Sequence, residues 1–306
     1  MSGLRVHQPG PLSLLQDAGR PGWQHLGVSP AGPLDLKAAA WANRLLGNAW
    51  GSPLLEIALG GLELESRLNT WVAVCGADLP ITVDDVARPN WSSFPLLAGQ
   101  RLRLGFARHG QRAYLAVAGG FQAPPVLGSV ATQAREGLGG LHGDGRPLQV
   151  GDLLPCAAAE RARPVSVPGV FVPDYRSLAL LRVITGGDAA GFAEDQLQAF
   201  FAQHWRLSPQ SDRMGARLAG VALQVPARPW SQGVACGTIQ VPADGQPIIL
   251  LADRQSMGGY PVLGWVHPLD LSLLAQLPAH ARLAFTPVSL SDAQAELRVF
   301  YQFFGR

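Results

Sequence analysis

The stretch RLRLGFARHGQRAYLAVAGG, residues 101–120, decides the fold class. It holds two short aliphatic runs, 101–106 and 112–117, and ends at Gly119-Gly120. In the first run, arginine and leucine alternate, which is the period of a strand with one buried face. Both runs are therefore predicted to be β-strands.

Similar runs recur along the chain and are mostly bounded by Gly, Pro or Asp, namely 12–15, 71–75, 180–184 and 247–251. The stretch 248–251 is continuously apolar, which is typical of a strand covered on both faces. The 36 glycines and 25 prolines are spread between these runs rather than gathered in one tail. The pattern predicts turn-rich β structure.

Three helices are expected, at 32–48, 189–204 and 289–304. The first has Pro33 near its start and Gly47 as a stop signal. The last begins at Ser289 with Asp292 three residues later, a capping pattern. The predicted fold class is mostly β, with a few helices.

Composition limits the classes of partner. Only 15% of the 306 residues are charged, against about 25% in an average globular chain, which favours an assembly over a lone monomer. The formal net charge of +2 comes from scattered basic residues, so neither nucleic acid nor an anionic membrane is an expected partner.

The expected compartment is the cytoplasm, because no apolar leader begins the chain and the three cysteines have no close spacing. The longest uncharged stretch, 113–134, is interrupted by Gly119-Gly120 and Pro124-Pro125. It is therefore not expected to form a membrane-spanning helix.

Lys37 is the only lysine among 24 basic residues. No Gly-Lys-Ser or Gly-Lys-Thr occurs, which excludes a Walker-type phosphate loop. Biotin is carried on a lysine amine in a hairpin turn, whereas Lys37 lies in a predicted helix. The chain is therefore expected to carry no biotin.

Two pairs of segments resemble each other: 16–23 with 253–261, and 101–106 with 281–285. Either chance or an internal duplication accounts for this likeness. The region 157–173 lacks periodicity and is the candidate linker. We expect one domain at residues 1–165 and a second at 166–306.

Four polar clusters lie among glycines in otherwise apolar sequence: QDAGRPGW (16–23), SDRMGARLAG (211–220), GTIQVPADGQP (237–247) and DRQSMGGYP (253–261). Their arginines can bind a carboxylate or phosphate, and neighbouring aspartates can hold those arginines in place. Their glutamines offer paired amide groups that match a lactam or urea. Each cluster, taken alone, is also explained by turn capping or by surface ion pairs.

Other chemistry is poorly supported. The sequence has no His-Glu-x-x-His, no Cys-x-x-Cys and no Gly-x-Ser-x-Gly, so no metal site or serine hydrolase is expected. His25 is either a general base or a hydrogen-bonding strut. Cys75 and Cys236 are expected to be inert packing residues.

The order of motifs across residues 4–300 resembles the allophanate hydrolase subunit 2, or biotin-dependent carboxyltransferase-like, family. The matching motifs include QDAGRPGW, HLGVSPAGPLD (25–35), ANRLLGN (42–48), LEIALGG (55–61), GADLP (76–80), YLAVAGG (114–120), SDRMG (211–215), GTIQVPADGQP and DRQSMGGYP. The resemblance implies two cyclophilin-like β-barrel domains.

The resemblance also implies a function. The chain is expected to act with the tightly bound B subunit of a 5-oxoprolinase and with its A subunit, opening 5-oxo-L-proline to L-glutamate with ATP hydrolysis. Whether ATP binds this chain or one of its partners is left open. Two alternatives also follow from the family: a carboxyltransferase component that moves a carboxyl group from carboxybiotin to urea or another small amide, and a non-catalytic regulator of a sensor kinase.

The motifs place the candidate residues. The candidate catalytic residues are Asp17, Arg20, Arg213 and Asp253. The candidate substrate-binding residues are Gln16, His25, Ser211, Asp212, Gln240, Arg254, Gln255, Gly258, Gly259 and Tyr260.

The sequence departs from the family pattern at three places: Pro33-Leu34, Cys236 and Ser256-Met257. The last replaces two hydroxyl side chains by one hydroxyl and one thioether. If those hydroxyls contact substrate, the specificity of this chain differs from the family norm.

Overall fold

A computed structural model describes residues 2–160 and 163–306, and the chain forms two compact units. Unit 1 contains the chain up to Arg20, Ala31–Arg176 and Phe304–Arg306, and unit 2 contains Pro21–Pro30 and Ser177–Phe303. The predicted boundary after residue 165 lies inside unit 1 by this grouping, and the domain limits stay a prediction. Residues 161 and 162 of the expected linker lie outside the described residues.

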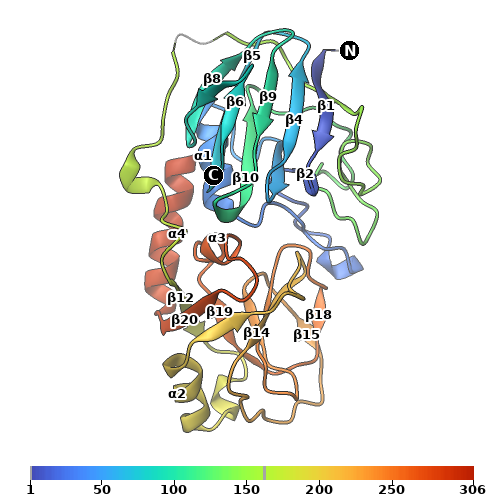
Figure 1. Cartoon of the computed structure of the whole chain (residues 1–306). Helices are drawn as coiled ribbons and strands as arrows, with labels where there is room; N and C mark the ends of the chain where they lie inside the picture. Colours follow the sequence, from blue (N-terminus) through green and yellow to red (C-terminus); the bar gives the residue numbers. More distant parts are fainter. Residues whose placement is uncertain (1, 161–162) are drawn as a thin grey trace. The chain divides into compact units, whose positions relative to one another are not determined.

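Unit 1 is built from two mainly antiparallel sheets, drawn from blue to green in Figure 1. The six-stranded sheet has the order β11 (Leu153–Pro155), β1 (Gly3–Pro9), β4 (Leu62–Ser66), β9 (Arg101–Leu104), β6 (Ile81–Val83) and β7 (Val86–Arg88). The five-stranded sheet has the order β2 (Leu12–Gln16), β3 (Leu54–Ala58), β10 (His109–Val117), β5 (Thr70–Asp78) and β8 (Ser92–Leu96).

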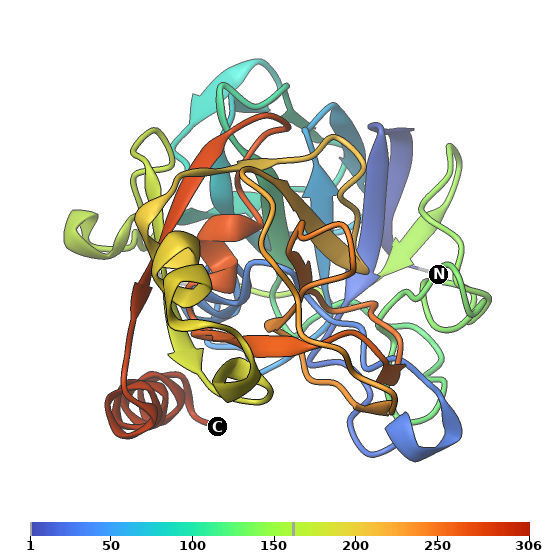
Figure 2. The same ribbon diagram turned by 90° about the horizontal axis from the view of Figure 1, so that it is seen from below.

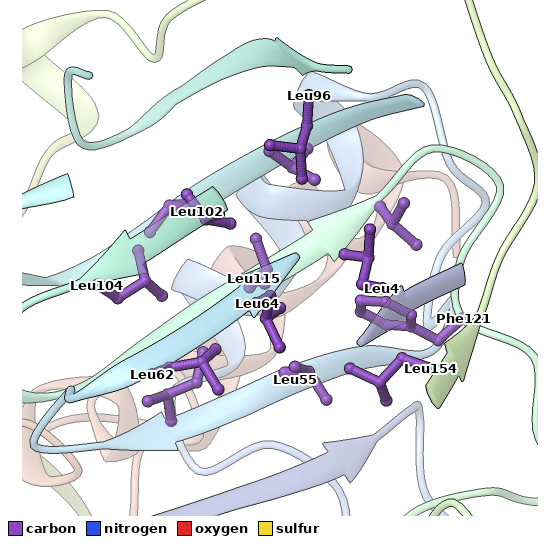
Figure 3. Close-up of a cluster of buried hydrophobic side chains, with 14 of the residues drawn as sticks. Leu4, Leu55, Leu62, Leu64, Leu96, Leu102, Leu104, Leu115, Phe121 and Leu154 are labelled. Atoms are coloured by element: carbon purple, nitrogen blue, oxygen red, sulfur yellow. The ribbon is translucent and has the colours of Figure 1, made fainter. Parts of the chain in front are cut away.

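The main core of unit 1 draws leucines from both sheets, as Figure 3 shows. Leu4, Leu64 and Leu102 come from the six-stranded sheet, and Leu55 and Leu115 from the other, and all five are fully buried. Burying one such side chain contributes roughly 1.5–3 kcal/mol. The alternation predicted at residues 101–104 is confirmed, since Leu102 and Leu104 are buried while Arg101 is exposed.

Helix α1 (Leu36–Leu45) covers the opposite face of the five-stranded sheet, packing on β5 and β10. Small side chains, Ala38, Ala39 and Ala42, form its buried face and allow close approach. The helix is shorter than predicted because Asp35 caps it, accepting a hydrogen bond from Ala38 N at 2.9 Å. At the other end Gly47, with φ of 61°, donates to Arg44 O at 2.9 Å and ends the helix as expected.

Unit 2 is a closed seven-stranded barrel (Figure 2). Its strands follow the order β12 (Ala179–Thr185), β19 (Val262–Val266), β16 (Thr238–Gln240), β17 (Ile248–Leu250), β14 (Gly215–Ala219), β13 (Trp205–Leu207) and β20 (Arg282–Pro287). The pairing of β12 with β20 is parallel. A separate ribbon joins β15 (Gln232–Gly233) to β18 (Met257–Gly258).

The helices of unit 2 are α2 (Glu194–Ala202), α3 (Leu271–Leu274) and α4 (Leu290–Phe304), whose last residue groups with unit 1. Short 3₁₀ helices lie at Gln24–Leu26, Gly169–Phe171 and Ala189–Gly191. The capping pattern predicted for α4 is confirmed, because Asp292 N donates to Ser289 Oγ at 3.1 Å. Within the described residues, no helix has both the length and the apolar character needed to span a bilayer.

Strands make up the sheets of unit 1 and the barrel of unit 2, with a few helices beside them. The predicted mostly β fold class is confirmed.

Candidate functional site

Arg213 and Asp253 form a two-pronged ion pair in unit 2. Arg213 Nε donates to Asp253 Oδ2 at 2.8 Å, and Nη2 donates to Oδ1 at 3.0 Å. Their side chains are only 11% and 9% exposed. The backbone reinforces the pair, since Asp253 N donates to Arg213 O at 2.9 Å. Two of the predicted catalytic residues are thus in direct contact.

The tight loop before β14 presents Arg213. Asp212 caps this loop, since its Oδ1 accepts from Met214 N at 2.8 Å and from Gly215 N at 3.1 Å. Ser211 Oγ accepts from Arg217 N at 3.0 Å. Both residues were predicted to bind substrate, and their described contacts hold the loop in shape.

Arg254 is buried and donates to two backbone carbonyl groups. Nε donates to Val234 O at 3.2 Å, and Nη1 to Leu251 O at 3.4 Å. Burial lowers the pKa of this guanidinium from its usual value. Ser29 Oγ donates to Arg254 O at 2.8 Å. Arg254 therefore fixes the loop that carries Asp253, unlike Arg213, whose fork is used on a carboxylate.

The cluster around Gln240 joins the segment DRQSMGGYP. Gln240 is buried and its Nε2 donates to Tyr260 O at 3.4 Å. A Cβ at Gly258 would lie 2.3 Å from Gln240 Nε2, so glycine is what lets this amide lie against the β15–β18 ribbon. Tyr260 is half exposed and Gly259 exposed, while Gln255 is partly exposed.

The cluster QDAGRPGW divides between the two units. Gln16 and Arg20 are buried in unit 1, where Gln16 Nε2 donates to Thr132 O at 3.2 Å and Arg20 donates to Ala131 O. Asp17 accepts from Ser129 Oγ at 2.5 Å and from Val130 N at 2.8 Å. These three residues hold the loop that follows residue 125.

His25 belongs to unit 2, where it is exposed and its Nδ1 lies 2.9 Å from Gly22 O. This contact matches the strut interpretation. Cys236, expected to be an inert packing residue, lies in the turn before β16 and is exposed as a residue. Cys75 is buried as expected, and burial raises the pKa of its thiol.

A buried polar network in unit 1 was missed by sequence reasoning. Tyr114 Oη donates to Glu56 Oε2 at 2.7 Å and accepts from Asp35 N at 2.7 Å. Glu56 also accepts from Leu34 N at 2.8 Å, and Tyr175 Oη donates to Asp35 Oδ2 at 3.2 Å. Burial, followed by the charge of Glu56, raises the pKa of Tyr114 well above its usual value. In the sequence, the available signal for this network was Glu56, the single charged residue within the apolar segment LEIALGG.

A cavity of about 320 Å³ in unit 1 was also missed. Its lining includes Asp17 together with Asn43, Arg44, Asn48 and Trp50. Three of these belong to the stretch ANRLLGN, and its polar residues were the available signal. Of the predicted site residues, only Asp17 lines this cavity.

The described residues contain no cluster of three or more His, Cys, Asp or Glu side chains that could hold a metal ion. The arrangement in unit 2 offers one fixed guanidinium and a buried amide, which suit an anionic oxygen and a planar amide.

Comparison with known proteins gives the family. The family model described as "Carboxyltransferase domain, subdomain A and B" matches residues 26–287. The chain belongs to this carboxyltransferase domain family. The member named as the C subunit of 5-oxoprolinase from Escherichia coli is 38% identical over 305 residues, covering 98% of this chain and 97% of that protein.

A second member of the family with the same name, from Haemophilus influenzae, is 36% identical and covers 93% of this chain and 90% of its own length. Among solved structures, the Kluyveromyces lactis urea amidolyase superposes with a TM-score of 0.90 at 28% identity. That match covers 99% of this chain but only 20% of the amidolyase.

Proposed function

We propose that this chain is the C subunit of an ATP-dependent 5-oxoprolinase and acts with the A and B subunits in the cytoplasm. The observation that carries the proposal is the 38% identity to the Escherichia coli C subunit, which extends over 98% of this chain and 97% of that protein. Because the match covers nearly all of both chains, it supports the same subunit role for this chain as for the Escherichia coli protein.

The chemistry defines what such a site must supply. The lactam of 5-oxoproline is a stable amide, and phosphorylation of its oxygen by ATP turns that oxygen into a leaving group. That transfer releases ADP. One water then adds to the ring carbon and the ring C–N bond breaks, which leaves an acyl phosphate, and a second water hydrolyses it to glutamate and phosphate. The protein must therefore stabilise negative charge on oxygen and orient the amide.

Arg213 and Asp253 fit the first demand. Asp253 fixes the guanidinium through Nε and Nη2, so its orientation is set before a ligand arrives. We assign Arg213 to the substrate carboxylate or to the transferring phosphoryl group, since a planar fork matches either oxygen edge. Asp253 positions Arg213, and Arg254 positions the Asp253 loop.

Gln240 fits the second demand. Its amide is buried beside Gly258 and Tyr260, where a carboxamide can read both the N–H and the C=O of a planar amide. We assign Gln255 to the same task and Tyr260 to closing the site, because its ring is half exposed.

The test is reconstitution. The chain is co-expressed with the neighbouring A and B subunits, and glutamate formed from 5-oxo-L-proline is measured with and without ATP. We expect ATP-dependent glutamate from the complex and none from the chain alone, because the sequence has no Walker-type loop. Turnover by the pure single chain, or a complex inert with ATP, contradicts the proposal.

A second candidate is a carboxyltransferase component for urea or another small amide. The TM-score of 0.90 to urea amidolyase favours it. The two functions differ in their need for biotin. Avidin blocks a carboxyltransferase assay, which depends on a biotinylated partner, and leaves ATP-dependent ring opening unchanged.

A further inference from the structure

Arg228 lies in the irregular segment between β14 and β15 of unit 2, and its side chain is only 2% exposed. Its Nη1 donates to Tyr260 O at 2.7 Å and lies 3.1 Å from Asp188 Oδ2. The guanidinium also lies 5.7 Å from the centre of the ring of Trp230, a residue that is more than half exposed. One end of this arginine therefore joins its segment to the residue that we assign to closing the site.

The other edge of the Arg228 guanidinium makes no hydrogen bond. Among the described residues, neither Nε nor Nη2 has a partner, although both atoms are shielded from water. In Arg213 the same two atoms bind the carboxylate of Asp253. A buried donor without a partner destabilises a folded chain. Stability alone therefore does not account for an arginine at this position.

Asp188 fixes the chain just beyond Tyr260. Asp188 N donates to Val262 O at 2.7 Å, and Val262 N donates to Asp188 Oδ2 at 2.8 Å. The same carboxylate oxygen pairs with Arg228. Because one carboxylate holds both the arginine and the start of β19, the Tyr260 carbonyl between them has a fixed place.

The Tyr260 carbonyl accepts from two donors of unequal strength. The bond from Arg228 is 2.7 Å long and charge-assisted, whereas the bond from Gln240 Nε2 is 3.4 Å long, longer than usual. This long bond is the only one that the Gln240 carboxamide makes within the described part of the chain. The carboxamide oxygen and the second N–H therefore remain available to the planar amide of a ligand.

We propose that Arg228 is a positioning residue for Gln240 and acts through the Tyr260 carbonyl. By making the stronger hydrogen bond to that oxygen, Arg228 prevents the Gln240 amide from being drawn toward it. The amide then keeps the orientation that binds substrate. This role rests on the proposed function, in which Gln240 binds the lactam of 5-oxo-L-proline.

Nuclear magnetic resonance of side-chain amides tests this competition on the isolated full chain. Arg228→Met removes the competing donor and leaves Tyr260 O to Gln240. The chain carries isotope-labelled glutamine, and the Gln240 signal is assigned by its loss in Gln240→Asn. We expect one Nε2 proton of Gln240 to move downfield in Arg228→Met, because its hydrogen bond shortens. An unchanged Gln240 signal overturns the proposal.

Unfolding in urea separates a positioning role from a structural one. Arg228→Met removes two unpaired donors, and the Asp188 side chain it leaves is 24% exposed, so water can serve that carboxylate. Its unfolding midpoint should stay near that of the parent. Arg182→Met is the contrasting variant, because every nitrogen of the Arg182 guanidinium donates to a carboxylate and the side chain of its partner Asp270 is only 5% exposed.

The midpoint of Arg182→Met should fall clearly, since a buried carboxylate loses its partner. If Arg228→Met falls as far, or fails to fold, Arg228 is a structural strut and the proposal is wrong.

Kinetics of the reconstituted complex test the consequence for substrate. In Arg228→Met we expect KM for 5-oxo-L-proline to rise roughly fivefold, the worth of one hydrogen bond, while KM for ATP stays as in the parent. In a Gln240→Ala background the same exchange should leave KM unchanged, because the group through which Arg228 acts is gone. Arg206→Met, an exposed exchange in unit 2, is the matched control and should behave as the parent.

The outcomes separate this inference from the proposed function. If the Gln240 signal moves in Arg228→Met but the complex forms no glutamate, the proposed function fails and the coupling of Arg228 to Gln240 stands. If the complex turns over and Arg228→Met leaves KM for 5-oxo-L-proline unchanged, the proposed function stands and the positioning role fails. A rise of both KM values together, or a further rise in the Gln240→Ala background, shows that Arg228 acts by another route and also refutes the role.

Discussion

The guanidinium of Arg213 binds the carboxylate of Asp253 edge to edge, with two parallel hydrogen bonds of 2.8 and 3.0 Å. The two residues are 40 positions apart in the chain, and both are largely shielded from water. An exposed pair in a turn contributes only about 0–1 kcal/mol, so the burial of this one distinguishes it from ordinary surface pairing.

Arg213→Lys tests that pair. The ammonium keeps the charge that neutralises Asp253, so the fold should be retained, but it cannot reproduce the fork. We expect kcat/KM of the reconstituted complex to fall at least tenfold, close to the effect of Arg213→Ala. Arg217→Lys, an exposed exchange in the same segment, is the control and should be nearly silent. Normal turnover of Arg213→Lys would remove this residue from the site.

Tyr114→Phe tests the buried network of unit 1. The hydroxyl serves both Asp35 N and Glu56 Oε2, so its loss leaves two buried polar groups one partner short. We expect the free energy of unfolding to fall by about 1–3 kcal/mol. Urea denaturation measures it, with Tyr260→Phe as the exposed control. A change below about 0.5 kcal/mol, the lower end of what one hydrogen bond contributes, would show that water replaces the hydroxyl.

His267 should make stability depend on pH. Burial, followed by the charge of Arg182, lowers the pKa of this imidazole below 6.5. The unfolded chain therefore binds more protons than the folded chain just below pH 6.5, and stability should fall as the pH falls from about 7.5 to about 5.5. The hydrogen bond from Arg182 lowers the pKa of Glu296 from 4.5, so its contribution is lost only at lower pH.

Urea denaturation at the two pH values checks this. His267→Gln should flatten the dependence, whereas His109→Gln, at an exposed position, should leave it as in the parent. Equal slopes for the parent and His267→Gln would assign the dependence to other groups.

Gly76 and Gly119 form a matched pair for backbone strain. Both have positive φ, 98° and 79°, but a Cβ at Gly76 would lie 2.4 Å from Arg112 O, whereas Gly119 has open space. Gly119→Ala should cost about 1–2 kcal/mol from the left-handed conformation alone. Gly76→Ala should cost clearly more, because strand β10 must also move. Equal unfolding midpoints in urea would contradict this geometry.

The proposed contact with the B subunit is expected to be largely apolar, because only 15% of the residues are charged. The complex should therefore survive gel filtration in about 1 M salt, where the Debye length shrinks to about 3 Å. Dissociation between low and high salt would show that charge pairs hold the interface.

Some of the strands and helices could be predicted because their signals are local, whereas α3, for example, was not predicted. The alternation at residues 101–104 and the Ser289 cap are both observed. The start of α1 could not be placed so closely, since whether Pro33 or Asp35 begins the helix depends on which side chain reaches Ala38 N.

The use of each arginine could not be predicted. Arg20, Arg213 and Arg254 stand in similar polar clusters, yet Arg20 and Arg254 donate to buried backbone carbonyls and Arg213 to a carboxylate. The acceptors of Arg20 and Arg213 lie 111 and 40 residues away, so only the folded chain distinguishes a guanidinium that binds backbone carbonyls from one that binds a carboxylate.

The closed barrel has a consequence for the chain before it meets its partners. In the closed barrel every strand has two neighbours, so no edge strand is left to pair with a strand of another molecule. The edge strands of the two sheets in unit 1 are also poor partners for such pairing. β7 and β11 are three residues long, and β8 contains Pro95, which has no N–H to offer. The fourth edge strand, β2, is covered by a loop, since Thr132 N donates to Leu15 O at 2.8 Å and Leu148 N to Ser13 O at 3.0 Å. Newly made chains can therefore accumulate without adding strands to one another, which matters for a chain that is proposed to assemble with separate polypeptides.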